Sequence, residues 1–192
     1  MLKEFLFEVC SNQFVSGFEH INGDQLRKYF EPYTDSYEND KLGSYIFKQE
    51  GINSRNIMLA AHIDEIGLMV TRILDNGFLS FTSVGGINPS SLVSQDVTVY
   101  GIKPPHVTPQ EERDKALKLK DLYIDTGYPR EELEKLVKVG DIATVKREPI
   151  SLQGDVISAK ALDDKACIAV MLETAKELRK LSHKSNIYYA AT

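Results

Sequence analysis

The sequence has little cysteine, no long apolar run and no surplus of positive charge. Its two cysteines, Cys10 and Cys167, indicate free thiols in a reducing compartment rather than a disulfide framework. The longest uninterrupted apolar run, residues 166–172, is seven residues long, whereas a membrane-spanning helix needs roughly 20. With 23 Lys and Arg against 28 Asp and Glu, the net charge is −5. We therefore expect neither a membrane span nor a nucleic-acid partner.

The composition is otherwise that of an ordinary folded protein. Hydrophobic residues make up 42% and charged residues 27% of the 192 residues, which argues against a disordered chain. The first residues, Met1 to Phe5, include an early acid and no apolar stretch of signal-peptide length. Together with the cysteine content, this predicts a cytoplasmic protein.

Hydrophobic periodicity predicts an α/β fold interrupted by β structure. Helices are expected at 2–10, 19–30 and 164–181, and strands at 33–37, 44–47, 57–61, 156–160 and 187–191. Between them, residues 66–74 and 78–82 flank Asn76-Gly77, a typical hairpin turn, and further short β segments with one short helix follow. The prediction is a mixed sheet packed by helices, formed by residues 1–65 and 155–192. A β-rich, barrel-like domain is inserted at 66–154.

Two of these segments carry specific packing predictions. The run at 57–61 is wholly apolar, which is typical of a strand covered on both faces of a sheet. In the long helix, a single face should carry the apolar side chains toward the core. These are Cys167, Val170, Met171, Ala175, Leu178 and Leu181.

The first chemically suggestive motif follows directly on the strand at 57–61. His62 and Asp64 are two residues apart, so on extended backbone both side chains point to the same side. They lie at the carboxyl end of the strand, where α/β sheets bind ligands. Imidazole is a common metal ligand, and a neighbouring carboxylate can fix its tautomer. Taken alone, a histidine at a strand end is more often a hydrogen-bonded structural residue.

The second motif is the pair Asp163-Asp164, where a strand is expected to turn into a helix. An aspartate there can simply cap the helix or favour the positive end of its dipole. However, if this strand runs parallel to 57–61, the pair lies at the same edge of the sheet as His62. One carboxylate could then bridge two cations that are about 3.5–4 Å apart.

Residues 60–70 (AAHIDEIGLMV) and 160–166 (KALDDKA) resemble the two metal motifs of the tetrahedral, dodecameric metallo-aminopeptidases. That family includes glutamyl and deblocking aminopeptidases, and its members are often labelled endoglucanases. Further ordered matches extend the resemblance along the whole chain. They lie at 16–19, 40–43, 85–86, 101–106, 120–125 and 188–192.

The resemblance implies a role for each motif residue. His62 would bind one of two divalent cations, zinc or cobalt, and Asp163 would bridge both through a carboxylate next to a cis Asp163–Asp164 peptide. Asp64 would act in catalysis by orienting His62. The family implies peptide substrates, removal of N-terminal residues and a homo-oligomer, in the family a dodecamer.

The resemblance also implies that part of the site is missing. The general-base glutamate, the adjacent metal-binding glutamate and the later ligands would all follow Thr192, so this chain holds two of five protein ligands. We therefore expect the 192-residue chain alone to be inactive. Two alternatives stay open: a glycoside hydrolase, which needs two carboxyl groups and no metal, and a non-catalytic fragment or interaction module.

Overall fold

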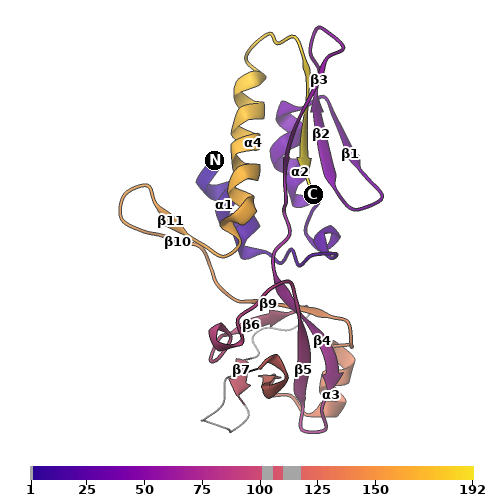
Figure 1. Ribbon diagram of the computed structural model, residues 1–192, viewed down its shortest axis with the longest axis vertical. Coiled ribbons are helices and arrows are strands. Elements are labelled where there is room, and N and C mark those ends of the chain that lie inside the picture. The colour runs from indigo at the N-terminus through magenta and orange to yellow at the C-terminus, as the bar shows by residue number, and fades with distance from the viewer. Residues whose placement is uncertain (1, 101–105, 110–117) are drawn as a thin grey trace. The chain divides into compact units, whose positions relative to one another are not determined.

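The computed structural model describes residues 2–100, 106–109 and 118–192 (Figure 1). The chain divides into a first unit, Met1–Asp64 with Glu148–Thr192, and a second unit, Glu65–Arg147. By this division residues 148–154 belong to the first unit, whereas the domains expected from the sequence placed them in the insert; that domain assignment stays a prediction. Most of the motif expected at 101–106 lies outside the described residues.

The first unit is built on a four-stranded mixed sheet. β12 is antiparallel to β2 and parallel to β3, with Asn186 beside Asn56 and Ala191 beside Ala61. The expected mixed sheet is therefore confirmed. In spatial order its strands are β1 (Ser36–Asn39), β2 (Tyr45–Gln49), β12 (Asn186–Ala191) and β3 (Asn56–Ala61).

Three helices pack on this sheet: α1 (Leu2–Ser11), α2 (Gln25–Phe30) and α4 (Leu162–Leu178). Figure 1 shows α1 and α4 side by side, and the two helices are in contact. Aromatic and aliphatic side chains from all three helices and the sheet form one buried cluster. Burying each large apolar side chain stabilises the fold by about 1.5–3 kcal/mol. The cluster includes Phe5, Val9, Phe30, Phe47, Ile168, Leu172 and Tyr189.

The single helix expected at 19–30 is wrong. The structure has a 3-10 helix at Glu19–Ile21, a break, and then α2. Gly23 lies in the break, where a side chain would overlap the ring of Tyr45. Close packing of backbone against this ring accounts for the glycine, and glycine in turn disfavours a continuous helix.

Three further expectations for the first unit are wrong. β3 is an edge strand with exposed Ile57 and Met58, so it is not covered on both faces. The strand expected at 156–160 shortens to β11 (Ile157–Ser158), which pairs with β10 (Ile150–Ser151) and lies outside the mixed sheet. In α4 the inward face is rotated from the expected one. Cys167 and Val170 are exposed, as is Leu181 beyond the helix end, while Lys165, Ile168, Ala169 and Leu172 are buried together with Met171 and Ala175.

The second unit is a six-stranded antiparallel sheet, and its own apolar cluster includes Leu68, Phe81, Val97 and Ile124. The expected hairpin is confirmed: β4 and β5 pair across a turn in which Gly77 has a φ of +81°. The sheet curls into a half-barrel, which confirms a β-rich part within an α/β fold. In spatial order the strands are β6 (Val97–Val99), β9 (Ile142–Val145), β4 (Gly67–Ile73), β5 (Phe78–Val84), β8 (Leu122–Asp125) and β7 (His106–Pro109), with α3 at Arg130–Leu136.

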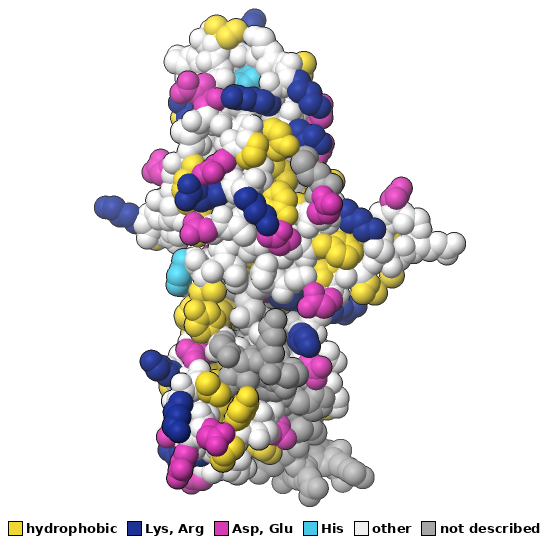
Figure 2. Space-filling view, turned by 180° about the vertical axis from the view of Figure 1, so that it is seen from behind, with side chains coloured by type: hydrophobic (Ala, Val, Ile, Leu, Met, Phe, Trp, Pro, Cys, Tyr) yellow, Lys and Arg dark blue, Asp and Glu magenta, His cyan; other side chains and the backbone are white. Residues whose placement is uncertain are grey.

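Ion pairs on the surface contribute little to the stability of the fold. Figure 2 shows basic and acidic side chains interspersed on the visible face. Exposed pairs such as Arg27 and Glu31, whose charged atoms are 2.8 Å apart, typically contribute under about 1 kcal/mol each. None of the helices in the described part of the chain has the length and hydropathy of a membrane span.

A buried polar network ties the sheet to α4. The side-chain nitrogen of Gln49 donates to the carbonyl oxygens of Tyr33 (2.8 Å) and Ala175 (3.0 Å). The Gln49 side-chain oxygen accepts a hydrogen bond from the hydroxyl of Tyr189 at 2.9 Å. Tyr189 is fully buried, and burial raises its pKa to about 12.

This raised pKa predicts a loss of stability at alkaline pH. The unfolded chain ionises Tyr189 near pH 10, whereas the folded chain keeps the proton until about pH 12. The contribution of Tyr189 to the free energy of unfolding is therefore fully present below pH 10. About 2–3 kcal/mol of it is lost as the pH rises toward 12. Urea unfolding of wild type and Tyr189→Phe between pH 8 and 11.5 checks this. Tyr189→Phe should be less stable at pH 8 but lose less stability on alkalinisation, and parallel curves would contradict the prediction.

Candidate functional site

The site begins where β3 ends. The amide of Ile63 donates to the carbonyl of Thr192 at 2.8 Å, and the amide of Thr192 donates to the carbonyl of Ala61 at 3.0 Å. These bonds extend the pairing of β3 with β12 by one step. Because Ile63 is buried and side chains alternate along extended backbone, the side chains of His62 and Asp64 point away from the core. Their side chains are 47% and 31% exposed.

Asp64 holds the imidazole of His62 in one orientation. The Nδ1 atom of His62 lies 2.8 Å from Oδ1 of Asp64. Since a carboxylate only accepts hydrogen bonds, Nδ1 carries the proton and the lone pair of Nε2 is left available in the neutral ring. Partial burial lowers the pKa of His62, but the hydrogen bond to Asp64 and its negative charge outweigh that effect and raise it above its ordinary value.

The available nitrogen of His62 faces Asp163. Nε2 of His62 lies 3.4 Å from Oδ1 of Asp163, and the Asp163 side chain is almost fully exposed. The peptide between Asp163 and Asp164 is cis, as the resemblance implied, and both residues have non-helical dihedral angles at the start of α4. The predicted convergence of these two side chains, which are about 100 residues apart in the chain, is therefore confirmed.

The reason for this convergence differs from the expected one. The strand that precedes Asp163, β11, belongs to a separate two-stranded sheet with β10 and not to the mixed sheet. Instead, α4 packs against α1 and β3, and its first turn is fixed by Lys165. Lys165 is fully buried; its Nζ donates to the carbonyl of Val9 at 3.0 Å and lies 4.5 Å from the ring centre of Phe14.

The buried position of Lys165 was not predicted from the sequence. A signal was present in the spacing. Lys165 precedes Ile168, Ala169 and Leu172 by three, four and seven residues, which places it on their face of the helix. A lysine on the buried stripe of a helix requires a partner, and the end of α1 provides one.

The thiols provide a simple test of this arrangement of α4. Cys167 is exposed and Cys10 is fully buried. A hydrogen bond between the Cys167 thiol and the side chain of Asp164, together with burial and nearby negative charge, raises the pKa of Cys167. We expect an aromatic disulfide reagent to modify one thiol per native chain. At about pH 8 this thiol should react more slowly than free cysteine, because the thiolate is the reactive form. Its reaction rate should increase as the pH is raised above about 8. Cys167→Ser should abolish the reaction; equal reactivity of both thiols would contradict the described packing.

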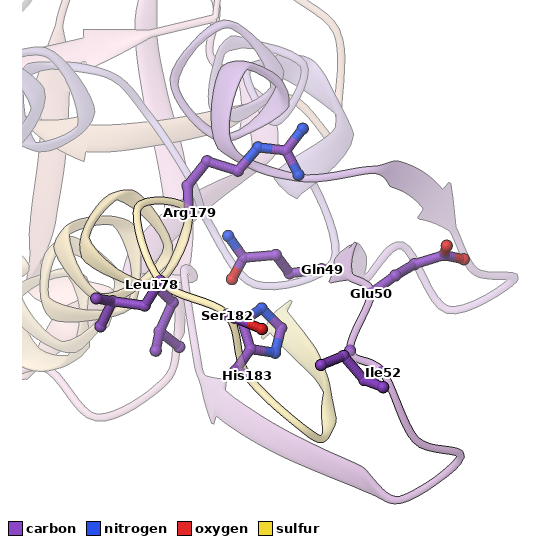
Figure 3. Close-up of a pocket in the computed structure, with 9 residues that line it drawn as sticks. Gln49, Glu50, Ile52, Leu178, Arg179, Ser182 and His183 are labelled. Carbon is purple, nitrogen blue, oxygen red and sulfur yellow. The ribbon is translucent and has the colours of Figure 1, made fainter.

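A hollow lies at the other end of the sheet. It has a volume of about 280 Å³ and lies where α4 ends and β12 begins (Figure 3). Its basic side chains already have partners: Arg179 bonds to Asp35 at 2.6 Å, and Nδ1 of His183 lies 2.8 Å from the carbonyl of Ser185. It is far along β12 from Ala191, which lies beside the strand end at His62. We therefore do not assign the chemistry to this hollow.

Within the described residues, no group of three or more His, Cys, Asp and Glu side chains is arranged to hold a metal ion. The arrangement at the end of β3 is a histidine, an orienting carboxylate and an exposed facing carboxylate. Such a set can contribute two ligands to a cation, and any remaining ligands must come from elsewhere.

Comparison with known proteins places this geometry in context. The M42 glutamyl aminopeptidase family matches residues 43–192. A putative aminopeptidase of Acetivibrio thermocellus is 37% identical over 181 residues, which cover 93% of this chain and 54% of the relative. A lysyl aminopeptidase of Pyrococcus furiosus is 30% identical, with 98% and 58% covered.

Solved structures agree. An aminopeptidase from Desulfurococcus kamchatkensis superposes with a TM-score of 0.92 at 32% identity, covering all of this chain and 55% of that one. A protein from Thermotoga maritima named an endoglucanase gives 0.86 at 28% identity, with 97% and 58% covered. The chain thus spans about half the length of the relatives that it matches. It belongs to the M42 glutamyl aminopeptidase family.

Proposed function

We propose that this chain forms part of a metal-dependent aminopeptidase that removes N-terminal residues from peptides. In this proposal His62 and Asp163 are ligands of divalent cations, and Asp64 orients His62. The main support is the 3.4 Å separation between Nε2 of His62 and Oδ1 of Asp163, together with membership of the aminopeptidase family.

The donor set fits a metal better than a simple ion pair. Hydrogen bonds between nitrogen and oxygen are usually 2.7–3.2 Å long, so the 3.4 Å separation is too long for a good one. Two ligand atoms that each lie about 2.1 Å from a tetrahedral zinc ion are separated by about 3.4 Å. Asp64 completes the arrangement, since metal-binding histidines commonly donate their second ring proton to a carboxylate.

A pair of divalent cations, zinc or cobalt, would supply polarisation of the scissile carbonyl and activation of water. The residues of this chain would do three things. His62 would present a neutral nitrogen, Asp64 would keep its tautomer and orientation, and Asp163 would offer two oxygens, one for each of two ions. On the family resemblance, the general base and the remaining ligands would be other residues, glutamates among them.

The assembly and location of the protein are also proposals. A Pyrococcus horikoshii neighbour at 29% identity is described as assembling into a tetrahedron or a large octahedral shell. By this likeness we propose a homo-oligomer of the tetrahedral, dodecameric kind. Cys10 and Cys167 form no disulfide, which supports a cytoplasmic location.

The function is tested with two proteins. The first is the 192-residue chain, for which we expect no turnover of aminoacyl-nitroanilides even with excess zinc or cobalt. The second, called the joined protein below, connects residue 192 to the part of the Acetivibrio thermocellus relative that this chain does not match. It should hydrolyse these substrates, lose activity with a chelator and regain it with metal.

The same assay distinguishes the aminopeptidase hypothesis from the glycoside hydrolase alternative. A glycoside hydrolase would cleave β-glucan with no effect of a chelator, because its two carboxyl groups need no metal. Chelator-resistant cleavage of glucan by the joined protein, without peptide hydrolysis, would refute the aminopeptidase proposal. Absence of both activities in a folded, metal-loaded protein would favour a non-catalytic module.

A further inference from the structure

The turn that carries Asp163 is attached to α1 on both sides. Before the turn, Nζ of Lys160 donates a hydrogen bond to the carbonyl oxygen of Asn12 at 3.1 Å. After it, Nζ of Lys165 donates to the carbonyl oxygen of Val9 at 3.0 Å. These contacts join residues that are 148 and 156 positions apart in the chain, so they connect the N-terminal helix to the start of α4.

The end of α1 is well suited to hold two ammonium groups. Val9 lies in its last turn, and Asn12 directly follows its last residue. The last four carbonyl groups of a helix have no partner within the helix, and the negative end of the helix dipole favours a cation there. Hydrogen bonds from a charged donor are also stronger than those between neutral groups. Each lysine therefore fixes one side of the turn.

The backbone between the two lysines has an unfavourable conformation. Ala161 is left-handed, with a φ of +56° and a ψ of 30°, which costs energy for any residue that has a side chain. Its neighbours Ala159 and Leu162 pack against the buried cluster of the first unit. Strained conformations persist only where the surrounding structure determines them. The shape of this turn is therefore imposed by its contacts with the rest of the unit.

Asp163 depends on this imposed shape for its position. Its side chain is 98% exposed, so packing around the carboxylate does not hold it in place. In the proposed function its Oδ1 shares an ion with Nε2 of His62, which is 3.4 Å away. The groups of such a site must be held to within about 0.5 Å of their working geometry. A displacement of about 1 Å can reduce activity by about 100-fold.

We infer that Lys160 and Lys165 are positioning residues for Asp163, and that α1 thereby controls how tightly the site holds divalent cations. Both ammonium groups donate to α1, so we assign neither of them a contact with the ion or the peptide. This inference rests on the proposed function, because it takes Asp163 to be a metal ligand. It adds that the N-terminal helix, to which we assign no ligand, determines the affinity of the site.

A positioning role and a purely electrostatic role predict opposite changes in metal affinity. Lys160 and Lys165 are three and two residues from Asp163. Removing a positive charge so close to a cation site would by itself raise the affinity for zinc or cobalt, because the repulsion between like charges would be smaller. Removing an anchor should lower the affinity, because the carboxylate of Asp163 would no longer be held at the separation that one ion requires. The sign of the change therefore distinguishes the two roles.

The test uses the joined protein with Lys160→Met or Lys165→Met, which remove the ammonium group and keep most of the stem. Cobalt(II) is titrated into each protein with visible absorbance as the readout, and kcat/KM is measured on aminoacyl-nitroanilides. We expect each variant to bind cobalt about 10- to 100-fold more weakly, as is typical when a residue that orients a ligand is changed. Excess cobalt should restore most of kcat, because the ligand atoms remain. Lys160→Arg keeps a charged donor and should bind cobalt like wild type.

Lys176 provides the matched control. It lies on the same helix, is partly exposed and pairs with Glu173 at 2.8 Å, so Lys176→Met should leave cobalt affinity and kcat/KM unchanged. Circular dichroism and the Tm of each variant report whether the protein is folded. Because Lys160 is only partly buried, Lys160→Met carries the test if Lys165→Met does not fold. A folded Lys160→Met protein that binds cobalt as tightly as wild type, or more tightly, would overturn the inference.

The 192-residue chain gives a readout that involves no metal. In wild type, Lys160→Arg and Lys176→Met, the amide of Asp163 should be rigid, with an NMR order parameter of about 0.85, whereas Lys160→Met should lower it to below about 0.6. The amide of Tyr189 in β12 should stay rigid in all four chains. An Asp163 amide that is equally rigid in Lys160→Met would overturn the inference.

Failure of this inference can be distinguished from failure of the proposed function. A joined protein that binds cobalt more weakly after Lys160→Met but hydrolyses no peptide would support the positioning role and refute the proposed function. Metal-dependent hydrolysis with equal cobalt affinity and kcat/KM in Lys160→Met and wild type would support the proposed function and overturn the inference. If the joined protein bound no cobalt, the order parameter of Asp163 would still decide whether the lysines hold the turn.

Discussion

Replacing Lys165 with alanine is expected to lower the free energy of unfolding by about 3 kcal/mol or more. Lys165 is fully buried, and its ammonium group donates to the carbonyl of Val9 in the last turn of α1. Carbonyls in that turn have no partner within the helix, and the negative end of the helix dipole favours a cation there. Alanine would leave a cavity in place of the lysine stem and an unpaired carbonyl in the core.

Urea unfolding followed by circular dichroism measures the effect, with two companion variants. Lys176→Ala removes a lysine from the same helix, but one that is partly exposed and paired with Glu173 at 2.8 Å, so it should cost under about 1 kcal/mol. Lys165→Met keeps most of the stem and should fall between the two. Equal losses for Lys165→Ala and Lys176→Ala would show that the buried ammonium does not anchor α4.

The elements with strong local signals were predictable from the sequence. The β4–β5 hairpin follows from Asn76-Gly77, whose glycine adopts the positive φ that the turn needs. The proximity of His62 and Asp163 was predicted from motif resemblance and is confirmed at 3.4 Å. The hairpin is specified by two adjacent residues, whereas the proximity of His62 and Asp163 was indicated by two short motifs about 100 residues apart.

Features that depend on distant packing were not predictable. The helix at 19–30 breaks because Gly23 lies against Tyr45, a contact between segments more than 20 residues apart. The buried face of α4 is set by α1 and β3, so Lys165 is inside and Val170 outside, contrary to hydrophobicity alone. The exposure of β3 was missed because a sequence pattern reports which residues suit burial, not whether a covering segment is present.

In the joined protein, His62→Ala and Asp163→Asn are each expected to reduce kcat/KM by about 10³-fold. Each removes one direct ligand, and a bound cation contributes several kcal/mol of transition-state stabilisation, with 1.36 kcal/mol equal to a factor of ten. Asp64→Asn should reduce kcat/KM less, by about 10- to 100-fold, since Asp64 acts through the 2.8 Å contact to His62 and not on the ion itself. His20→Ala is the matched control, because His20 is an exposed histidine on the 3-10 helix Glu19–Ile21.

Metal dependence distinguishes a ligand from a structural residue in this series. If Asp64 only orients His62, excess zinc or cobalt should restore much of the activity of Asp64→Asn, because the ligand atoms remain and only the affinity has fallen. Excess metal should not restore His62→Ala or Asp163→Asn, in which a coordinating atom is lost. Bound metal per chain, measured by elemental analysis, should fall in the same order. If Asp163→Asn kept its full metal content and a normal kcat/KM, Asp163 would not be a bridging ligand. The proposed dinuclear arrangement would then be wrong.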